Sequence, residues 1–140
     1  MVTYWDTSAL IPLLLKEATS ESYRRIARET EIVTWWGAAV ECASGIERRV
    51  REGESLAKTT AAYRNLNELL PHWREIHPSE SLRRSAIRLL RTHRLRAADA
   101  LHVAAATVAS DFAPTTARFL TTDARLKVVA EREGFVVEAT

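Results

Sequence analysis

Hydrophobic residues occur along the chain in two alternating patterns, short continuous runs and longer stretches with helical spacing. The short runs predict buried strands over residues 2–5, 31–34, 73–76, 118–121 and 135–138. Between them, apolar residues that recur every three or four positions predict helices over residues 7–17, 21–29, 36–51, 55–70, 81–92, 97–110 and 123–133. Because strands that alternate with helices build parallel sheets, we expect an α/β fold with a central, mostly parallel sheet flanked by helices.

Two neighbouring helices are expected to form an antiparallel hairpin. The first, over residues 36–51, ends at Gly53 and carries one apolar stripe made of Trp36, Ala39, Val40, Ala43, Ile46 and Val50. The second follows Ser55 and stops before Pro71. We expect Trp36 to pack into the core through this stripe.

The size and cysteine content narrow the class of protein. At 140 residues the chain has the length of one compact domain, so we expect residues 1–140 to form a single unit. The apolar run over residues 9–15 is far shorter than a membrane span and follows an acid, so we expect neither an export signal nor a membrane anchor. One cysteine, Cys42, excludes an internal disulfide and fits a cytoplasmic protein, with Cys42 as a small core residue.

Arginine makes up seventeen of the twenty basic residues, and its planar guanidinium binds phosphates in a bidentate way. Residues 81–98 contain six arginines and no acid, and three of them share one helix face: Arg84, Arg88 and Arg91. This face is a candidate track for RNA phosphates. A genome that favours arginine codons would explain the overall excess equally well, and a solvated helix face is the alternative for the local cluster.

The four aspartates are scarce enough to consider singly, because Asp is a poor residue inside helices but a good cap and metal ligand. Asp6 and Asp123 each follow a predicted strand, and open parallel sheets bind their ligands at the carboxyl ends of the strands. Asp99 lies at the start of a predicted helix, where it could also be a cap. Asp111 is expected to form a turn at a helix end.

Glu41 is a fourth candidate for the same site. On its predicted helix it shares a face with Gly37, Ser44 and Gly45, which are small enough to leave open space around the carboxylate. Four converging carboxylates would repel one another unless cations neutralised them. Oxygen ligands suit Mg²⁺ or Mn²⁺, and two such ions about 3.5–4 Å apart can activate a water and stabilise the leaving oxygen of a phosphodiester. The pattern therefore favours a metal-dependent nuclease.

Four segments of the chain resemble the PIN domain, specifically the VapC-type ribonuclease toxins of toxin–antitoxin pairs: WDTSAL, WWGAAVECASGIERR, LRAADALHVAAA and FLTTDARL. The resemblance covers essentially the whole chain and implies a PIN-like fold that includes the hairpin. It implies that four acids bind Mg²⁺ or Mn²⁺ and cleave RNA: Asp6, Glu41, Asp99 and Asp123. It also implies a homodimer, a cognate VapB-like antitoxin that shields the acidic cleft, and supporting roles in the site for Thr7, Ser8 and Thr121.

The chain departs from the family pattern at two positions. Gly37 stands where many relatives carry a hydroxyl residue, and Thr121 stands where some carry a further acid. These departures leave open whether one or two metal ions bind.

Several other interpretations stay open at this point. A housekeeping RNA-processing PIN nuclease and a catalytically idle RNA-binding module are the alternatives to a toxin. A haloacid-dehalogenase-like phosphatase also begins with an acid after its first strand, but Ser8 occupies the place of its second acid. His102 lies one turn after Asp99 and could orient it, although a structural role is the more common one for such a histidine. Trp35 and Trp36 could stack on an unpaired base, with core packing favoured for Trp36.

Overall fold

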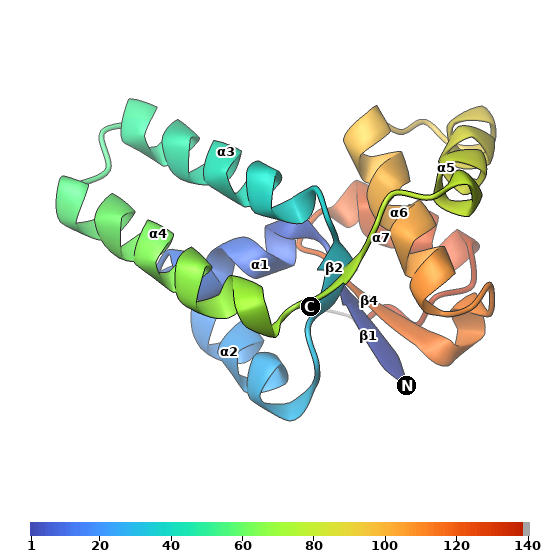
Figure 1. Cartoon of the computed structure of the whole chain (residues 1–140), viewed down its shortest axis with the longest axis horizontal. Coiled ribbons are helices and arrows are strands. Elements are labelled where there is room, and N and C mark those ends of the chain that lie inside the picture. Colours follow the sequence, from blue (N-terminus) through green and yellow to red (C-terminus); the bar gives the residue numbers. More distant parts are fainter. Residues whose placement is uncertain (139–140) are drawn as a thin grey trace.

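The computed structural model describes residues 1–138 and has an α/β fold built on a parallel sheet (Figure 1). Its four strands are β1 (Val2–Trp5), β2 (Val33–Trp35), β3 (Arg74–Ile76) and β4 (Ala117–Leu120). They lie in the order β3-β2-β1-β4, and every pairing between them is parallel. The predicted α/β fold with a central parallel sheet is confirmed.

Seven α-helices flank the sheet within residues 1–138: α1 (Thr7–Leu14), α2 (Ser20–Glu29), α3 (Ala38–Arg51), α4 (Leu56–Leu69), α5 (Glu80–Thr92), α6 (Ala97–Ala109) and α7 (Ala124–Arg132). Two short 3₁₀ helices, Leu70–His72 and Pro114–Thr116, precede β3 and β4. In Figure 1, α1 to α4 lie on one side of the sheet, and α5 to α7 lie on the other. Helices therefore cover both faces, as the sequence predicted.

Successive strand residues point to opposite faces of the sheet and fill two separate cores. Tyr4 and Phe119 belong to the core under α5, α6 and α7, where their rings stack with centroids 5.4 Å apart. Trp5 and Leu120 belong to the core formed with α1 to α4. Burial on both faces explains why these strands appear in the sequence as continuous hydrophobic runs.

The pairing of β1 with β4 determines where the site lies. The register runs from Val2 opposite Ala117 to Trp5 opposite Leu120. The residues that follow these two strands, Asp6 and Thr121, therefore emerge at the same level of the sheet edge.

Helices α3 and α4 form the predicted hairpin, but the buried face of α3 differs from the predicted stripe. Ala38, Cys42 and Ile46 are buried, whereas Trp36 is 52% exposed and Val40 is 69% exposed. The expectation that Trp36 packs into the core is wrong. Small and large apolar residues occupy two adjacent faces of this segment, and packing against α1 and α4 selects the face with the small residues.

Several predicted element boundaries also differ. Helix α1 ends at Leu14 rather than near residue 17, because the backbone of Leu15 is extended. Strand β2 begins at Val33 rather than residue 31, since pairing with both neighbours starts there. Residues 135–138 form no regular strand, and an isolated parallel bridge joins Val136 to Arg118.

The single cysteine is fully buried beside the site, as predicted. Burial raises the pKa of the Cys42 thiol to about 12, with a further contribution from the charges of Glu41 and Asp6. Over residues 1–138, no helix combines the length and the apolar composition needed to cross a membrane.

Candidate active site

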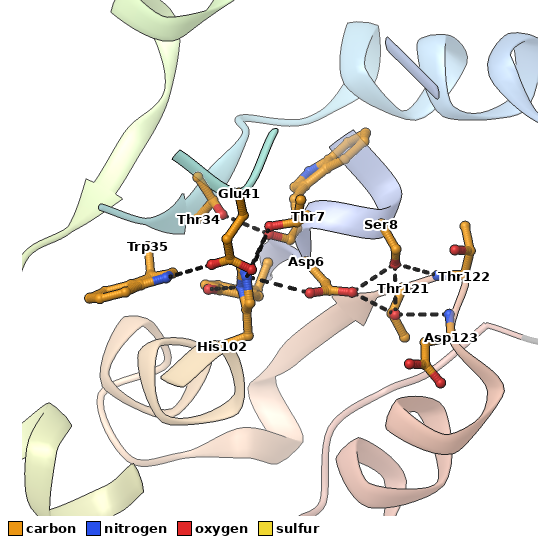
Figure 2. Close-up of polar contacts among 12 residues, drawn as sticks. Asp6, Thr7, Ser8, Thr34, Trp35, Glu41, His102, Thr121, Thr122 and Asp123 are labelled. Carbon is orange, nitrogen blue, oxygen red and sulfur yellow. Dashed lines mark hydrogen bonds and ion pairs between the residues drawn. The ribbon is translucent and has the colours of Figure 1, made fainter. Parts of the chain in front are cut away.

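Asp6 lies at the carboxyl end of β1 and is only 5% exposed. Its Oδ2 accepts hydrogen bonds from Ser8 Oγ at 2.7 Å and from Thr121 Oγ1 at 2.8 Å (Figure 2). These two hydroxyl oxygens in turn accept hydrogen bonds from the backbone N–H groups of Thr122 and Asp123. Although Asp6 is the N-cap residue of α1, its side chain accepts no capping hydrogen bond from a backbone N–H of that helix. Capping therefore does not explain this carboxylate.

Glu41 lies in the first turn of α3, and donors from three other elements converge on it. Oε1 accepts a hydrogen bond from Thr7 Oγ1 at 3.3 Å and lies 3.1 Å from His102 Nε2, while Oε2 accepts one from Trp35 Nε1 at 3.2 Å. Asp6, and not Thr7 or Ser8, is the N-cap residue of α1, and the hydroxyls of Thr7 and Ser8 donate to Glu41 and Asp6.

His102, on α6, joins the two acids to the core and is 1% exposed. Its Nε2 lies 3.0 Å from Thr7 Oγ1, 3.1 Å from Glu41 Oε1 and 3.5 Å from Asp6 Oδ1. On the other side of the ring, Nδ1 lies 2.8 Å from the hydroxyl of Tyr4. The sequence suggested Asp99 as the partner of His102, but the imidazole contacts Glu41 and Asp6 in its place.

The buried polar groups alter the acidity of His102 and Glu41. Burial acts to lower the pKa of His102, but the hydrogen bond to Glu41 and the charges of Asp6 and Glu41 outweigh it and raise the pKa. Burial acts to raise the pKa of Glu41, but the hydrogen bonds from His102, Trp35 and Thr7 hold it below its ordinary value. An anionic Glu41 and a cationic His102 thus stabilise each other.

Glu41 does border open space, since it lines a cavity at the sheet edge, but the small residues are not its cause, because side chains pack on both glycines. A Cβ atom at Gly37 would lie 2.3 Å from Cζ2 of Trp35, and one at Gly45 would lie 2.9 Å from Cδ1 of Ile11. Gly37 therefore lets the Trp35 indole come close enough to donate its hydrogen bond to Glu41. The sequence identified the small residues but could not identify the side chains that pack on them.

Asp99 lies in the first turn of α6 and is half-buried. It forms no hydrogen bond or ion pair with any residue that the structure describes. Burial raises the pKa of its carboxyl group, and the charges of Asp6 and Asp123 raise it further. Asp99 thus lies near the carboxylates of Asp6 and Asp123, and no hydrogen-bond donor or cation within residues 1–138 contacts it directly.

Asp123 follows β4 and is the N-cap residue of α7. Its Oδ1 accepts hydrogen bonds from the backbone N–H groups of Arg125 at 2.9 Å and Leu126 at 3.3 Å. Asp123 therefore caps α7 through Oδ1. This cap fixes the carboxylate at the mouth of the site, beside Ser8 and Thr121 (Figure 2).

All four predicted acids line one cavity of about 440 Å³ at the carboxyl edge of the sheet: Asp6, Glu41, Asp99 and Asp123. The predicted supporting residues lie close to it. Thr7 and Ser8 line the cavity, and Thr121 donates a hydrogen bond to Asp6 but does not line the cavity itself. These residues come together because strand ends and helix starts of a parallel sheet meet at one edge, and their roles in catalysis and metal binding stay a prediction.

The donor set of this cavity suits a hard divalent cation such as Mg²⁺ or Mn²⁺. All four acids offer carboxylate oxygens. Burial and the charges of Asp6 and Asp123 raise the pKa of Asp99, and the charges of His102 and Arg96 offset this only in part. Within residues 1–138, no three His, Cys, Asp or Glu side chains form a ready-made metal site. Asp6 accepts a hydrogen bond from a hydroxyl group, and Glu41 contacts an imidazole. A bound ion would therefore compete with these donors for the carboxylate oxygens.

Four arginines that the sequence did not assign to the site line the acidic cavity: Arg48, Arg94, Arg96 and Arg125. Two of them, Arg94 and Arg96, do belong to the arginine-rich stretch of residues 81–98. The predicted face of Arg84, Arg88 and Arg91 lies elsewhere on α5, and none of its residues lines this cavity. Arg88 pairs with Glu133 at 2.5 Å. Contact of that face with RNA stays a prediction. Proximity in sequence to the acids was the available signal, because Arg96 and Arg125 lie within three residues of Asp99 and Asp123.

Comparison with known proteins agrees with this architecture. No curated protein matches the chain in sequence. The crystal structure of PAE2754 from Pyrobaculum aerophilum is similar in fold, with a TM-score of 0.69 and 18% sequence identity, over 98% of this chain and 90% of that one. The family model of the PIN domain matches residues 3–132, and PIN domains are generally nucleases that use divalent metals. The chain belongs to the PIN domain family.

Proposed function

We propose that this protein is a metal-dependent endoribonuclease and the toxin of a VapBC-type toxin–antitoxin pair that acts in the cytoplasm. The observation that carries the nuclease proposal is the convergence of Asp6, Glu41, Asp99 and Asp123 on one cavity. The family supports a nuclease in general. The choice of RNA and of the toxin role rests on the resemblance of the sequence to VapC-type proteins.

The four acids would hold Mg²⁺ or Mn²⁺, which when bound activates a water and stabilises the leaving oxygen of the phosphodiester. The chain's own residues orient these acids. Ser8 and Thr121 hold Oδ2 of Asp6, so that Oδ1 is turned toward the space shared with Glu41 and His102. Burial and the neighbouring acids raise the pKa of Asp99, so a nearby cation would favour the ionised form of this carboxyl group.

The direct test is metal-dependent cleavage of single-stranded RNA by purified wild type and by two variants, Asp6→Asn and Asp99→Asn. Both variants should lose at least a hundredfold in rate, because each removes an anionic ligand without changing side-chain size. Asp111→Asn is the matched control, since Asp111 lies outside the cavity and has a left-handed φ of 54° that Asn tolerates. Wild-type cleavage rates in Asp6→Asn would remove this acid from the active site.

The proposed toxin role requires a protein that restrains the nuclease. Three apolar side chains of the α3–α4 hairpin are exposed, Val40, Val50 and Leu56, and we assign them to contacts with a VapB-like antitoxin or with the second copy of a homodimer. Strong induction should arrest growth, and mapping of new RNA ends across the transcriptome should identify the target. A chain that is harmless on induction and monomeric at micromolar concentration would instead support a housekeeping RNA-processing nuclease.

The outer face of α5 is proposed to contact RNA phosphates without reading sequence. Arg84 and Arg91 are exposed and form no ion pair with the residues that the structure describes, whereas Arg88 shares its charge with Glu133. Replacing all three with Ala should weaken RNA binding and reduce its salt dependence by up to about 0.7 slope units per lost contact. An unchanged slope would identify a merely solvated helix face.

A further inference from the structure

Each of three acid-bearing segments also carries an arginine to the cavity. Arg48 lies two turns after Glu41 on α3, Arg96 immediately precedes α6 with Asp99, and Arg125 follows Asp123 at the start of α7. A fourth, Arg94, comes from the same connection as Arg96. Positive charge therefore borders the acids on three sides, while the segment after β1 contributes hydroxyl groups instead.

These arginines do not neutralise the acids directly. All four are exposed, and none is within ion-pair distance of a carboxylate among residues 1–138. Elsewhere on the molecule, arginines do pair with acids, as in Arg88 with Glu133 and Arg49 with Glu17. Asp6 and Glu41 use hydroxyl, indole and imidazole donors, which leaves the guanidinium groups available to an external anion.

We infer that Arg48, Arg96 and Arg125, together with Arg94, bind the phosphates that flank the cleaved bond of one unpaired RNA strand. This inference rests on the proposed nuclease function and names how the same site holds its substrate. Asp6 is buried at the base of the cavity, so the cleaved phosphate has to enter it while its neighbours remain at the rim, where the arginines lie. The flexible backbone of an unpaired strand can bend in this way, and guanidinium groups match phosphate in geometry and charge.

The number of charges supports this arrangement. The cavity is lined by as many arginines as acidic residues. Once divalent ions neutralise the acids, the arginines leave a net positive rim that only an anion can offset. A binding module without metal would gain nothing from placing carboxylates among its arginines.

The test measures binding of a labelled 12-nucleotide single-stranded RNA in MgCl₂, with cleavage blocked by Asp6→Asn in every chain compared, over a range of KCl concentrations. A triple variant, Arg48→Ala with Arg96→Ala and Arg125→Ala, should bind at least tenfold more weakly. Its salt dependence should fall by up to about two slope units, since each lost phosphate contact on a single strand accounts for about 0.7. The matching triple Lys variant should keep the slope and lose only part of the affinity, because it keeps the charges but not the bidentate geometry.

The control is a second triple Ala variant at Arg24, Arg64 and Arg132, which are exposed, lie outside the cavity and give the same change in net charge. It should bind RNA with nearly the wild-type slope. Equal losses in both triple variants, or an unchanged slope in the cavity variant, would overturn the inference. Metal-dependent cleavage is measured in parallel on chains that keep Asp6, so that a chain that binds as expected but does not cut would refute the proposed function alone.

Discussion

Individual residues of the site combine a local position that sequence can identify with distant partners that it cannot. Asp6 was identifiable because it follows a strand, and its partner Thr121 follows another. The role of His102 could not be identified in this way, because its partners Tyr4 and Glu41 lie 98 and 61 positions away along the chain. Only the packing of α6 against β1 and β2 of the sheet brings these side chains together.

Replacing Asp6 with Asn should separate activity from stability. The amide oxygen can still accept hydrogen bonds from Ser8 and Thr121, while the loss of negative charge relieves repulsion with Asp99. Oδ1 of Asp6 also lies 3.5 Å from His102 Nε2, and its charge helps to raise the pKa of that imidazole, so the lost attraction offsets part of this gain. We therefore expect an unchanged or higher melting temperature in chelator, together with lost cleavage. A melting temperature well below that of the wild type would make Asp6 a structural residue.

The two glycines of α3 provide a matched pair of substitutions. Gly37→Ala should destabilise the fold by about 1–3 kcal/mol, because the new Cβ would overlap the rigid Trp35 ring, and it should also break the indole hydrogen bond to Glu41. Gly45→Ala meets only the flexible end of Ile11 and gains helix propensity, so its effect on the free energy of unfolding should be close to zero. Chemical denaturation of both variants tests this difference. Equal changes in the free energy of unfolding for the two variants would show that the overlap with Trp35 adds no destabilisation of its own.

Whole elements were predictable where their signals are local. Ser55 and Ser79 cap α4 and α5 by accepting backbone hydrogen bonds, and Gly134 closes α7 with a φ of 103°. The orientation of α3 was not predictable, since two adjacent apolar faces offered similar periodicity and only the neighbouring helices select one. The predicted strand over residues 135–138 forms only an isolated bridge at Val136, because an apolar run does not determine how many of its residues pair with a neighbouring strand.

The contact between α5 and α7 should make stability depend on pH through Glu133. Its carboxylate binds Arg88 and lies 2.8 Å from His93 Nε2. Burial acts to raise the pKa of Glu133, but these two partners outweigh it and lower the pKa below the usual 4.5. A lowered pKa in the folded state gives stability that is present above about pH 4.5 and is lost as the pH falls through the folded-state pKa.

Glu133→Gln should therefore lower the free energy of unfolding at pH 7 by on the order of 1 kcal/mol, and the difference should shrink steadily below pH 4.5. Glu131→Gln is the control, because Glu131 is exposed in the last turn of α7 and its side chain forms no hydrogen bond or ion pair with the described residues. Urea denaturation at several pH values measures the effect. A difference between Glu133→Gln and wild type that stays constant down to pH 3 would contradict it.

At the scale of the whole molecule, the parallel sheet accounts for how much of the site the sequence predicted. Its carboxyl edge collects Asp6 and Asp123 from two strands and Asp99 from the start of α6, so residue position alone was informative. The arginines at the rim could not be assigned in the same way. Seventeen are spread along the chain, and only the tertiary arrangement distinguishes Arg48 from its neighbour Arg49, which pairs with Glu17.

Magnesium should stabilise the whole fold through the same acidic edge. An ion that binds the folded but not the unfolded chain adds about 1.4 kcal/mol at ten times its dissociation constant. For a chain of 140 residues, this corresponds to a rise in melting temperature of roughly 3–6 °C. Because Asp99 has a raised pKa and no direct partner in residues 1–138, Asp99→Asn should lose most of this rise, whereas Asp111→Asn should keep it.

Thermal melts of the three proteins in chelator, in MgCl₂ and in KCl of equal ionic strength separate binding from screening. Screening weakens the repulsion among the acids in any salt, so part of the rise should occur in KCl, and only the excess in MgCl₂ reports on a bound ion. In chelator, Asp99→Asn should melt at or above the wild-type temperature, because it removes one of the mutually repelling charges. If Asp99→Asn gained as much from MgCl₂ as the wild type does, the ion would bind elsewhere on the molecule, and the carboxyl edge would not be its site.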